Sequence, residues 1–127
     1  MKTRITHRLS DQDTSHIIFQ TSFGIGKTQW SGPGLKMGEP LDVELDLDEI
    51  FSWNRNIFPT HEVTSRISIV GNSTYITAEL AHLTGDDCAA LKLGNSIILI
   101  ELDSPLPQQS GFVEIRATTI HLYPTNV

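Results

Sequence analysis

The residues of this chain whose types and spacing suit a chemical role lie in one short segment. Apolar residues at positions 41, 43, 45 and 47 alternate with four carboxylates, Asp42, Glu44, Asp46 and Asp48. This period of two predicts a strand with one buried face and one carboxylate face, along which neighbouring carboxylates are about 6.6–6.8 Å apart. Like charges in such a row repel one another, so this acidic stripe favours contact with a cation or a basic partner.

Three interpretations of the acidic stripe are open. Its spacing is close to that of phosphates along a nucleic-acid strand, which suits a protein that fills the basic groove of a nuclease. A calcium site is the second, but Ca²⁺ takes about six to eight oxygens that converge on one point, whereas a straight stripe spreads its oxygens. The plainest interpretation is a solvated edge strand whose charges discourage aggregation with other sheets.

A phosphate-binding loop is excluded by its context. The segment Gly24–Thr28 ends in Gly-Lys-Thr after an apolar run, as a Walker loop does. The first glycine of that motif is replaced by Thr21, and the residues after the motif, 30–34, contain Gly and Pro where a helix must begin. We therefore expect an ordinary glycine turn.

Metal ligands and catalytic groups are not indicated either. The five histidines lack metal-ligand spacing, since Ser65 stands where a zinc-protease motif starting at His61 requires its second histidine. The single cysteine, Cys88, follows Asp87, and an adjacent acid raises the pKa of a thiol, so a buried structural role is expected. No nucleophile–base pair is evident, and we predict no enzyme activity, no metal and no cofactor.

Strand patterns surround the acidic stripe. The hairpin turns Gly71-Asn72 and Gly94-Asn95 separate alternating apolar segments, and further strands are expected at 5–9 and 17–19. Residues 97–100 are apolar on both faces, which predicts a central strand or one covered on both sides. The apolar phase reverses at 118–119, as a β-bulge would cause.

Two segments depart from strand periodicity. Residues 24–40 contain five Gly and two Pro and are expected to form a loop or an irregular crossing. Ile50, Trp53 and Ile57 have helical spacing after a capping Asp48, which predicts a short helix that ends before Pro59. The expected fold is all-β: a small antiparallel β-barrel or sandwich of roughly six to eight strands with at most one short helix. An oligonucleotide-binding-type barrel has this shape, but shape alone carries no function.

Composition limits the class of protein. The length of 127 residues and a hydrophobic fraction of 39% predict a single globular β domain, residues 1–127. The longest apolar run has four residues, and no apolar segment follows the basic N-terminus, so a cytoplasmic protein without a membrane partner is expected. A net charge of -6 argues against nucleic acid as the partner. Composition does not define an oligomeric state.

The acidic stripe and three other segments carry a resemblance that covers about residues 41–127. The other segments are 53–57 (WNRNI), 93–101 (LGNSIILIE) and 121–126 (HLYPTN). Together they resemble small single-domain bacterial all-β proteins without assigned activity, and compact acidic proteins of this size include immunity proteins that act beside secreted toxins. The resemblance implies a binding role and supplies no catalytic residue.

The function expected from the sequence is that of a non-enzymatic immunity or inhibitor protein that occludes a basic protein partner. The acidic stripe would face Lys and Arg of the partner, and Trp30, in a glycine-rich segment, would anchor the contact. The alternative is a β-barrel that binds a small ligand or an oligonucleotide, which requires local cations. The candidates are scattered along the chain: Lys27, Lys36, Arg55 and Arg66.

Overall fold

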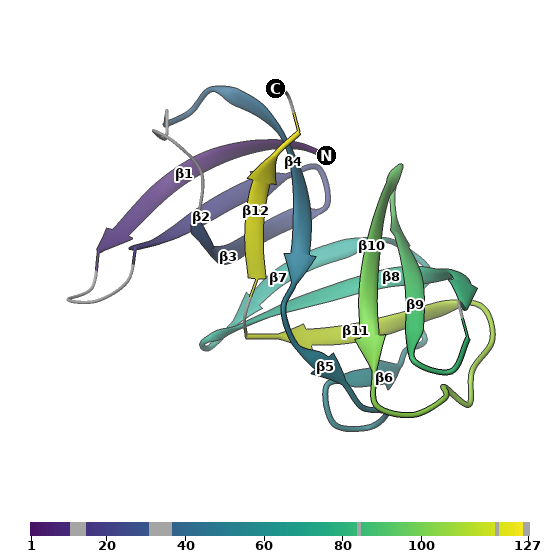
Figure 1. Cartoon of the computed structure of the whole chain (residues 1–127). Coiled ribbons are helices and arrows are strands. Elements are labelled where there is room, and N and C mark those ends of the chain that lie inside the picture. Colours follow the sequence, from purple (N-terminus) through teal and green to yellow (C-terminus); the bar gives the residue numbers. More distant parts are fainter. Residues whose placement is uncertain (11–14, 31–36, 84, 119, 126–127) are drawn as a thin grey trace.

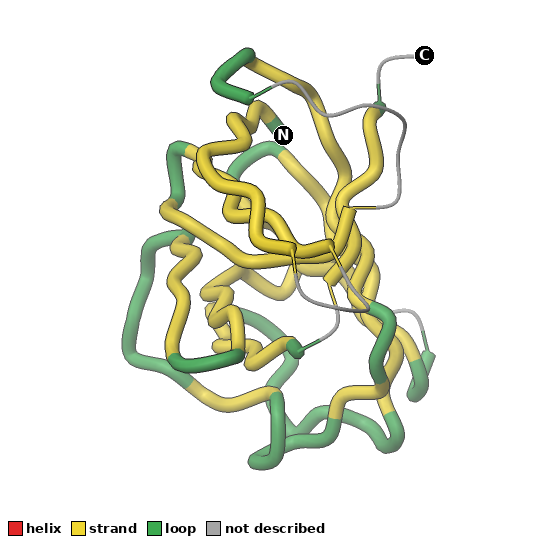
Figure 2. Tube along the Cα trace, turned by 90° about the vertical axis from the view of Figure 1, so that its left-hand side faces the viewer, coloured by secondary structure: helices red, strands yellow, loops and turns green. Residues whose placement is uncertain are grey.

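The described part of the chain folds into strands and loops. The structure, a computed structural model, describes residues 1–10, 15–30, 37–83, 85–118 and 120–125, and no helix occurs in these ranges. Figure 1 shows two barrel-like regions, and Figure 2, turned by 90°, shows the same strands from the side. The strands are β1 (Lys2–Ser10), β2 (Ser15–Thr21), β3 (Gly24–Trp30), β4 (Pro40–Leu47), β5 (Ile50–Phe51), β6 (Ile57–Pro59), β7 (Arg66–Val70), β8 (Ser73–Leu83), β9 (Cys88–Leu93), β10 (Ser96–Leu102), β11 (Phe112–Ala117) and β12 (Ile120–Pro124).

The first region is a closed barrel of five strands. β1, β2 and β3 form an antiparallel meander, and β4 pairs antiparallel with both β1 and β12. β12 also pairs in parallel with β3, through His121 opposite Gln29 and Leu122 opposite Trp30, and this pairing closes the barrel. Because the barrel is closed, each of these five strands is paired on both edges over at least part of its length.

The second region is inserted in the chain between β4 and β12. Its longest strand, β8, pairs with β7 through its first half, with β9 through its second half, and with β11 along its opposite edge. β10 follows β9 as a hairpin, and β6 extends the sheet beyond β11. β5 pairs in parallel with the last two residues of β10. The sheet thus curls toward closure, with a single bridge between Trp53 and Ile57 near β5 and β6.

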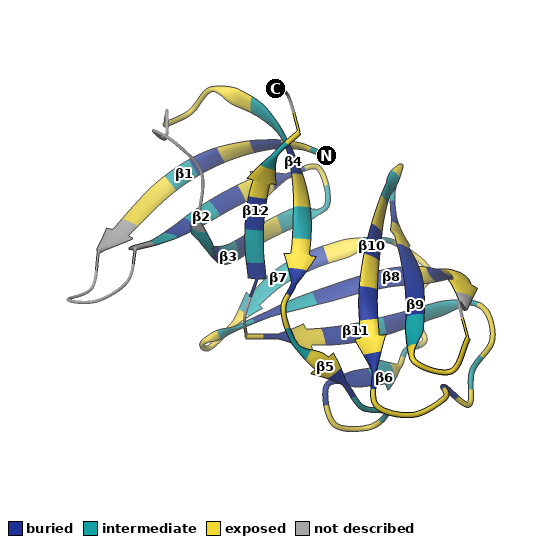
Figure 3. Cartoon of the chain, viewed as in Figure 1, coloured by how far each residue is buried: buried dark blue, intermediate teal, exposed yellow. Residues whose placement is uncertain are grey.

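Several strands bury one side of a period-two pattern, whereas β8 and β9 each bury three residues in succession. Along β11, Val113, Ile115 and Ala117 are buried, and along β12, Ile120 and Leu122 are buried. Figure 3 shows the alternation of buried and exposed residues on both regions. Both sets of inward side chains belong to one hydrophobic cluster, so the core is continuous through the two regions.

Two glycines allow the two regions to approach closely. Gly24, with φ of 133°, pairs with Ile67 of β7, and a Cβ at Gly24 would lie 1.9 Å from the Ile67 carbonyl oxygen. Gly94, in the β9–β10 turn with φ of 60°, faces the ring of Phe23, whose Cζ would be 2.2 Å from a Cβ there. These positions require glycine because no side chain fits.

Several sequence predictions about the elements are confirmed. β1 and β2 lie at the expected positions, and β4 covers the acidic stripe except for Asp48. The two hairpins turn at Gly71-Asn72 and Gly94-Asn95, where each glycine has positive φ. The all-β barrel class is also confirmed, but the strand count is 12 rather than six to eight.

The prediction of a loop over residues 24–40 is wrong for its first part, because Gly24–Trp30 forms β3. The glycines there serve close approach rather than a turn: a Cβ on Gly26 would lie 2.3 Å from the Phe19 ring. Residues 31–36 lie outside the described ranges.

The predicted helix and bulge are also wrong. Residues 50–57 form β5, a turn and the start of β6, and Asn54 has a positive φ of 67° that no α-helix contains. The phase reversal near residue 118 marks the passage of the chain from β11 in the second region to β12 in the barrel, not a bulge within one strand. Residue 119 is outside the described ranges.

Candidate functional site: a groove between β4 and β10

The acidic stripe lies on the outer face of β4. Val43 and Leu47 are buried in the barrel, whereas Glu44 and Asp46 are exposed. Asp42 is half-buried, and Asp48 lies beyond the end of the strand. The predicted alternation is therefore confirmed, but its four carboxylates occupy different surroundings.

The strands beside β4 divide the acidic stripe further. Asp42 is opposite Lys2 of β1, so its charge faces a cation across the strand pair. Glu44 is opposite Tyr123 and Asp46 is opposite His121, both on β12. The rings of His121 and Tyr123 are 6.3 Å apart, and Tyr123 is exposed. Glu44 and Asp46 thus share their face with an exposed aromatic side chain.

β10 presents an exposed apolar row next to these carboxylates. Ile97 is 54% exposed and Leu99 is 70% exposed, whereas Ile98 and Ile100 point into the core at 2% exposure. Figure 3 shows this alternation along β10. Of the two alternatives for residues 97–100, coverage on both faces is wrong within the described chain, because one face of the run is open to solvent. The other is met in part, since β10 lies between β9 and β5 in the sheet. Exposed apolar side chains in such a row mark an interaction surface.

A groove separates β10 from β4. The chain runs from β4 into β5, and β5 pairs in parallel with Glu101 and Leu102 at the end of β10. Away from this point β4 and β10 are not paired, and two adjoining hollows of about 350 and 460 Å³ lie between them. Residues that line the hollows from both strands include Glu44, Leu45, Asp46, Ile97, Leu99 and, from β12, Tyr123.

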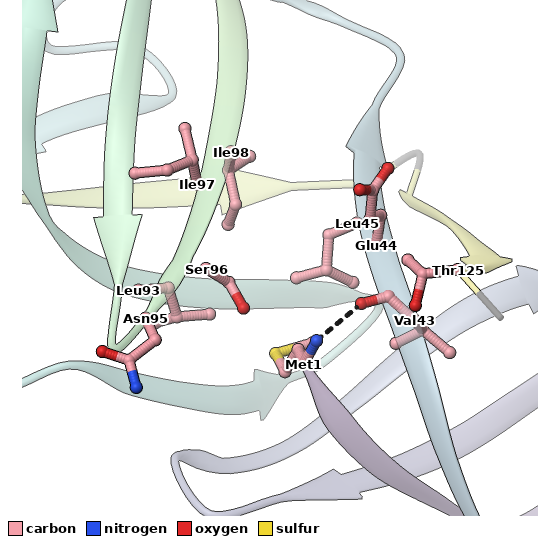
Figure 4. Close-up of a pocket in the computed structure, with 10 residues that line it drawn as sticks. All are labelled: Met1, Val43, Glu44, Leu45, Leu93, Asn95, Ser96, Ile97, Ile98 and Thr125. Atoms are coloured by element: carbon pink, nitrogen blue, oxygen red, sulfur yellow. Dashed lines mark hydrogen bonds between the residues drawn. The ribbon is translucent and has the colours of Figure 1, made fainter.

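The N-terminal residue lies in the first hollow (Figure 4). The Met1 ammonium donates to the Val43 carbonyl oxygen at 2.9 Å, and the Val43 amide donates to the Met1 carbonyl oxygen at 2.9 Å. Figure 4 shows residues of β10 on one side of the hollow and Leu45 and Glu44 of β4 on the other. The groove therefore has a mixed lining, in which the Met1 ammonium and Ser96 lie near Leu45, and its β4 side carries carboxylates.

Where the groove ends, hydrogen bonds join β5 to the residue after β10 and to the turn that follows β5. The Ser52 hydroxyl donates to the Asp103 carboxylate, and the Asp103 amide donates to the Phe51 carbonyl oxygen at 3.1 Å. The Asn56 side chain accepts from the Ser52 amide at 2.7 Å and donates to the Ile50 carbonyl oxygen at 3.1 Å. The bond from Ser52 lowers the pKa of Asp103 below its ordinary value, because it stabilises the charged carboxylate.

The three strands of the barrel that follow β4 around the sheet, β1, β2 and β3, have the reverse charge. β1, β2 and β3 contain no Asp or Glu, and they contain four cations, Lys2, Arg4, Arg8 and Lys27. Lys2 and Arg4 line a hollow of about 390 Å³ together with Gln20 of β2. The Arg4 guanidinium also donates to the Gly38 carbonyl oxygen at 2.7 Å. The net negative charge of the chain therefore lies elsewhere than on this sheet.

The other predicted candidates do not gather in one place. Trp30 is the last residue of β3, and its side chain lies outside the described part of the structure. Arg55 is in the turn after β5 and Arg66 is on β7, while Lys36 is not described. Cys88 is only half-buried, and partial burial, then the charges of Asp87 and Glu101, raise the pKa of its thiol.

The described residues contain neither a cluster of metal ligands nor a long apolar helix. No three His, Cys, Asp or Glu side chains in the described ranges converge as metal ligands would. Nor do these ranges contain a helix that is long and apolar enough to span a membrane. No protein-family model, no curated protein and no solved structure matches this chain.

Sequence reasoning missed half of the groove. Ile97 and Leu99 look like core residues because the whole run 97–100 is apolar, and only the pairing of strands shows which face is open. Tyr123 joins them because β12 pairs with β4. The signal that could have found them is the lack of any further apolar segment to cover a second face of β10.

Proposed function

We propose that this chain is a non-enzymatic binding domain that occludes a basic protein partner, as an inhibitor or immunity protein does. The observation that carries the proposal is the groove in which Ile97, Leu99 and Tyr123 are exposed beside Glu44 and Asp46. Apolar and aromatic anchors supply affinity in such a contact, while the carboxylates speed association and select a basic partner.

A contact of this kind favours Lys and Arg side chains in particular. Their aliphatic stems can cover Ile97 and Leu99 while their charged ends reach Glu44 or Asp46 across the hollow. Acidic partners are repelled by the same carboxylates. The groove thus supports a partner that is both basic and partly apolar, rather than a simple cation.

Titration with a short synthetic peptide of alternating lysine and valine tests this proposal. We expect binding that weakens as salt is raised, and a loss of about tenfold in affinity for the Leu99→Ser variant, which removes an exposed anchor. The matched control is Val70→Ser, which removes another exposed apolar residue far from the groove in the sequence and on β7. Equal loss in both variants, or no binding at all, would refute the proposal.

A second candidate function has its own observation. The closed barrel of five strands has the architecture of oligonucleotide-binding folds, which bind on the face of the second and third strands. In this chain the third strand carries Lys27, and Lys2 and Arg4 lie on the neighbouring β1, without a carboxylate on the three strands. A small anionic ligand or a single-stranded oligonucleotide is the ligand that this face favours.

An oligothymidine titration at low salt tests the second candidate. Binding that is lost in the Lys2→Gln/Lys27→Gln variant and retained in Glu44→Gln would support it. Absence of binding at low salt would remove it and leave the groove as the candidate site.

A further inference from the structure

We infer that the partner's segment binds in the groove as an added β-strand, paired with the open edge of β10. This inference rests on the proposed function, because it specifies how a basic segment would be held there. The observation behind it is the backbone pairing of β10, not the positions of side chains. Residues Ser96–Ile100 pair with β9 along one edge, and along the other edge they have no partner strand among the described residues.

The open edge has hydrogen-bonding groups that point toward the groove. The Leu102 amide donates toward the β9 side, to the Asp87 carbonyl oxygen, and the Asp103 amide donates toward β5, to the Phe51 carbonyl oxygen. The amide and carbonyl groups of successive residues in a strand point to opposite edges. Those of Ile97 and Leu99 therefore point away from β9, as those of Asp103 do. They face the space that β5 fills further along the chain.

β4 borders the same space with an open edge of its own. The Thr125 amide donates to the Asp42 carbonyl oxygen on the β12 side, whereas Val43 exchanges hydrogen bonds with Met1 on the opposite side. By alternation, the backbone groups of Leu45 point to the Met1 side, where the described residues provide no paired strand. The groove therefore lies between β4 and β10, which run in the same direction. Hydrogen bonds join the two sides only further along, where β5 pairs with the end of β10.

An apolar open edge is unusual in a monomeric protein unless something binds to it. Natural edge strands are commonly protected by charges, proline, bulges or short length. β10 has seven residues, and Ile97 and Leu99 are exposed along the unpaired part. Addition of an extended segment satisfies the backbone groups and covers these side chains at once.

The charges identify the occupant as a basic strand and not a second copy of this chain. An added strand has two rows of side chains, one toward the floor near Leu45 and Ile98 and one outward beside Ile97 and Leu99. Lysine or arginine in the outward row can reach Glu44 and Asp46. Two copies paired through β10 would instead offer no lysine or arginine to Glu44 and Asp46, because β10 contains neither.

Residue-resolved amide hydrogen exchange tests the inference with the alternating lysine–valine peptide as the probe. In the protein alone, the Ile97 and Leu99 amides should exchange rapidly, while those of Ile98 and Ile100, which face β9, exchange slowly. With the peptide at about ten times its dissociation constant, exchange at Ile97 and Leu99 should slow by about tenfold. The amides of Ile98 and Ile100 are internal controls, and their slow exchange should persist.

Two peptides with the same side chains separate strand addition from docking by side chains alone. One carries N-methyl groups on its valines and the other on its lysines, so each peptide blocks the opposite edge of its strand. Strand addition predicts that one of them binds at least about tenfold more weakly than the other, which is the loss of about 1.4 kcal/mol.

The outcomes distinguish this inference from the proposed function. Equal affinity of the two methylated peptides, or unchanged exchange at Ile97 and Leu99 in the bound state, would overturn strand addition while the groove remained a binding site. No binding of the parent peptide would overturn both. A dimer of the chain alone that Leu99→Lys abolishes would assign the edge to a second copy and would also overturn the inference.

Discussion

The two regions of this molecule treat their strand edges differently. In the barrel, β12 pairs with both β4 and β3, and this closes the circle of five strands. In the second region, β5 pairs with only the last two residues of β10, which leaves the rest of that strand open beside the groove. Complete closure serves stability, and the incomplete closure produces a surface where exposed apolar residues, carboxylates and open backbone groups coincide.

Charge also differs between parts of the barrel itself. The sheet formed by β1, β2 and β3 carries cations without carboxylates, whereas the rim of the groove carries Glu44 and Asp46. A molecule with this separation can attract ligands of opposite sign to different sides. The net charge of -6 alone therefore does not describe what the surface can bind.

The largest expected effect comes from breaking the junction that holds the two regions together. Gly24→Ala forces a Cβ against the Ile67 carbonyl oxygen at a position with φ of 133°. We expect the free energy of unfolding to fall by about 4 kcal/mol, measured by urea denaturation. The control is Gly71→Ala, where φ is 62° but nothing lies near the new Cβ, and where about 1 kcal/mol is expected. Equal losses would contradict the account of the junction.

Opposite substitutions on β10 sharpen the contrast between its two faces. Ile98→Ala removes a core side chain and should lower the free energy of unfolding by about 2–4 kcal/mol. Leu99→Ser changes a side chain that is 70% exposed and should alter stability by less than about 0.5 kcal/mol. Urea denaturation of both variants checks this, and a larger loss for Leu99→Ser would show that its exposed face is covered within the chain.

Much of the fold is predictable from local pattern, but the groove is not. The alternation at Leu41–Leu47 and the turns at 71–72 and 94–95 are local signals, and the corresponding strands form as expected. Glycines at positions 24 and 26 look like loop residues, because the close contacts with Ile67 and Phe19 that require them come from distant segments. The open face of β10 depends likewise on which strands pair, and pairing is not encoded in any one segment.

Charge substitutions along the acidic stripe test whether it acts as a unit. Asp46→Asn and Glu44→Gln remove carboxylates that line the groove, and together they should slow association with the lysine–valine peptide by about three- to tenfold at low salt. Asp48→Asn removes an equal charge beyond the end of β4 and should have little effect. Stopped-flow association rates at two salt concentrations measure the difference. Equal slowing by each substitution would favour a diffuse field over a local contact.

The smallest effect is expected from pH at the end of the groove. The folded-state pKa of Asp103 is below its ordinary value of 3.8, chiefly because Ser52 donates a hydrogen bond to the carboxylate. Its contribution to stability is therefore present above that ordinary value and is lost as pH falls through the lower folded-state pKa. In the Asp103→Asn variant, stability should therefore fall less steeply as the pH is lowered through this range. Thermal unfolding measured at several pH values checks this. An unchanged acid profile would assign the loss to other carboxylates.

The most direct test of the central claim is to map, by NMR, where the lysine–valine peptide binds. The account predicts that amide shifts change around Glu44–Asp46, Ile97–Leu99 and Tyr123, and that β1, β2 and β3 are unaffected. Oligothymidine, added separately, provides the comparison for the sheet of β1, β2 and β3. Changes confined to the barrel face of β1–β3, or no change at the groove at saturating peptide, would contradict the assignment of the groove as the binding site.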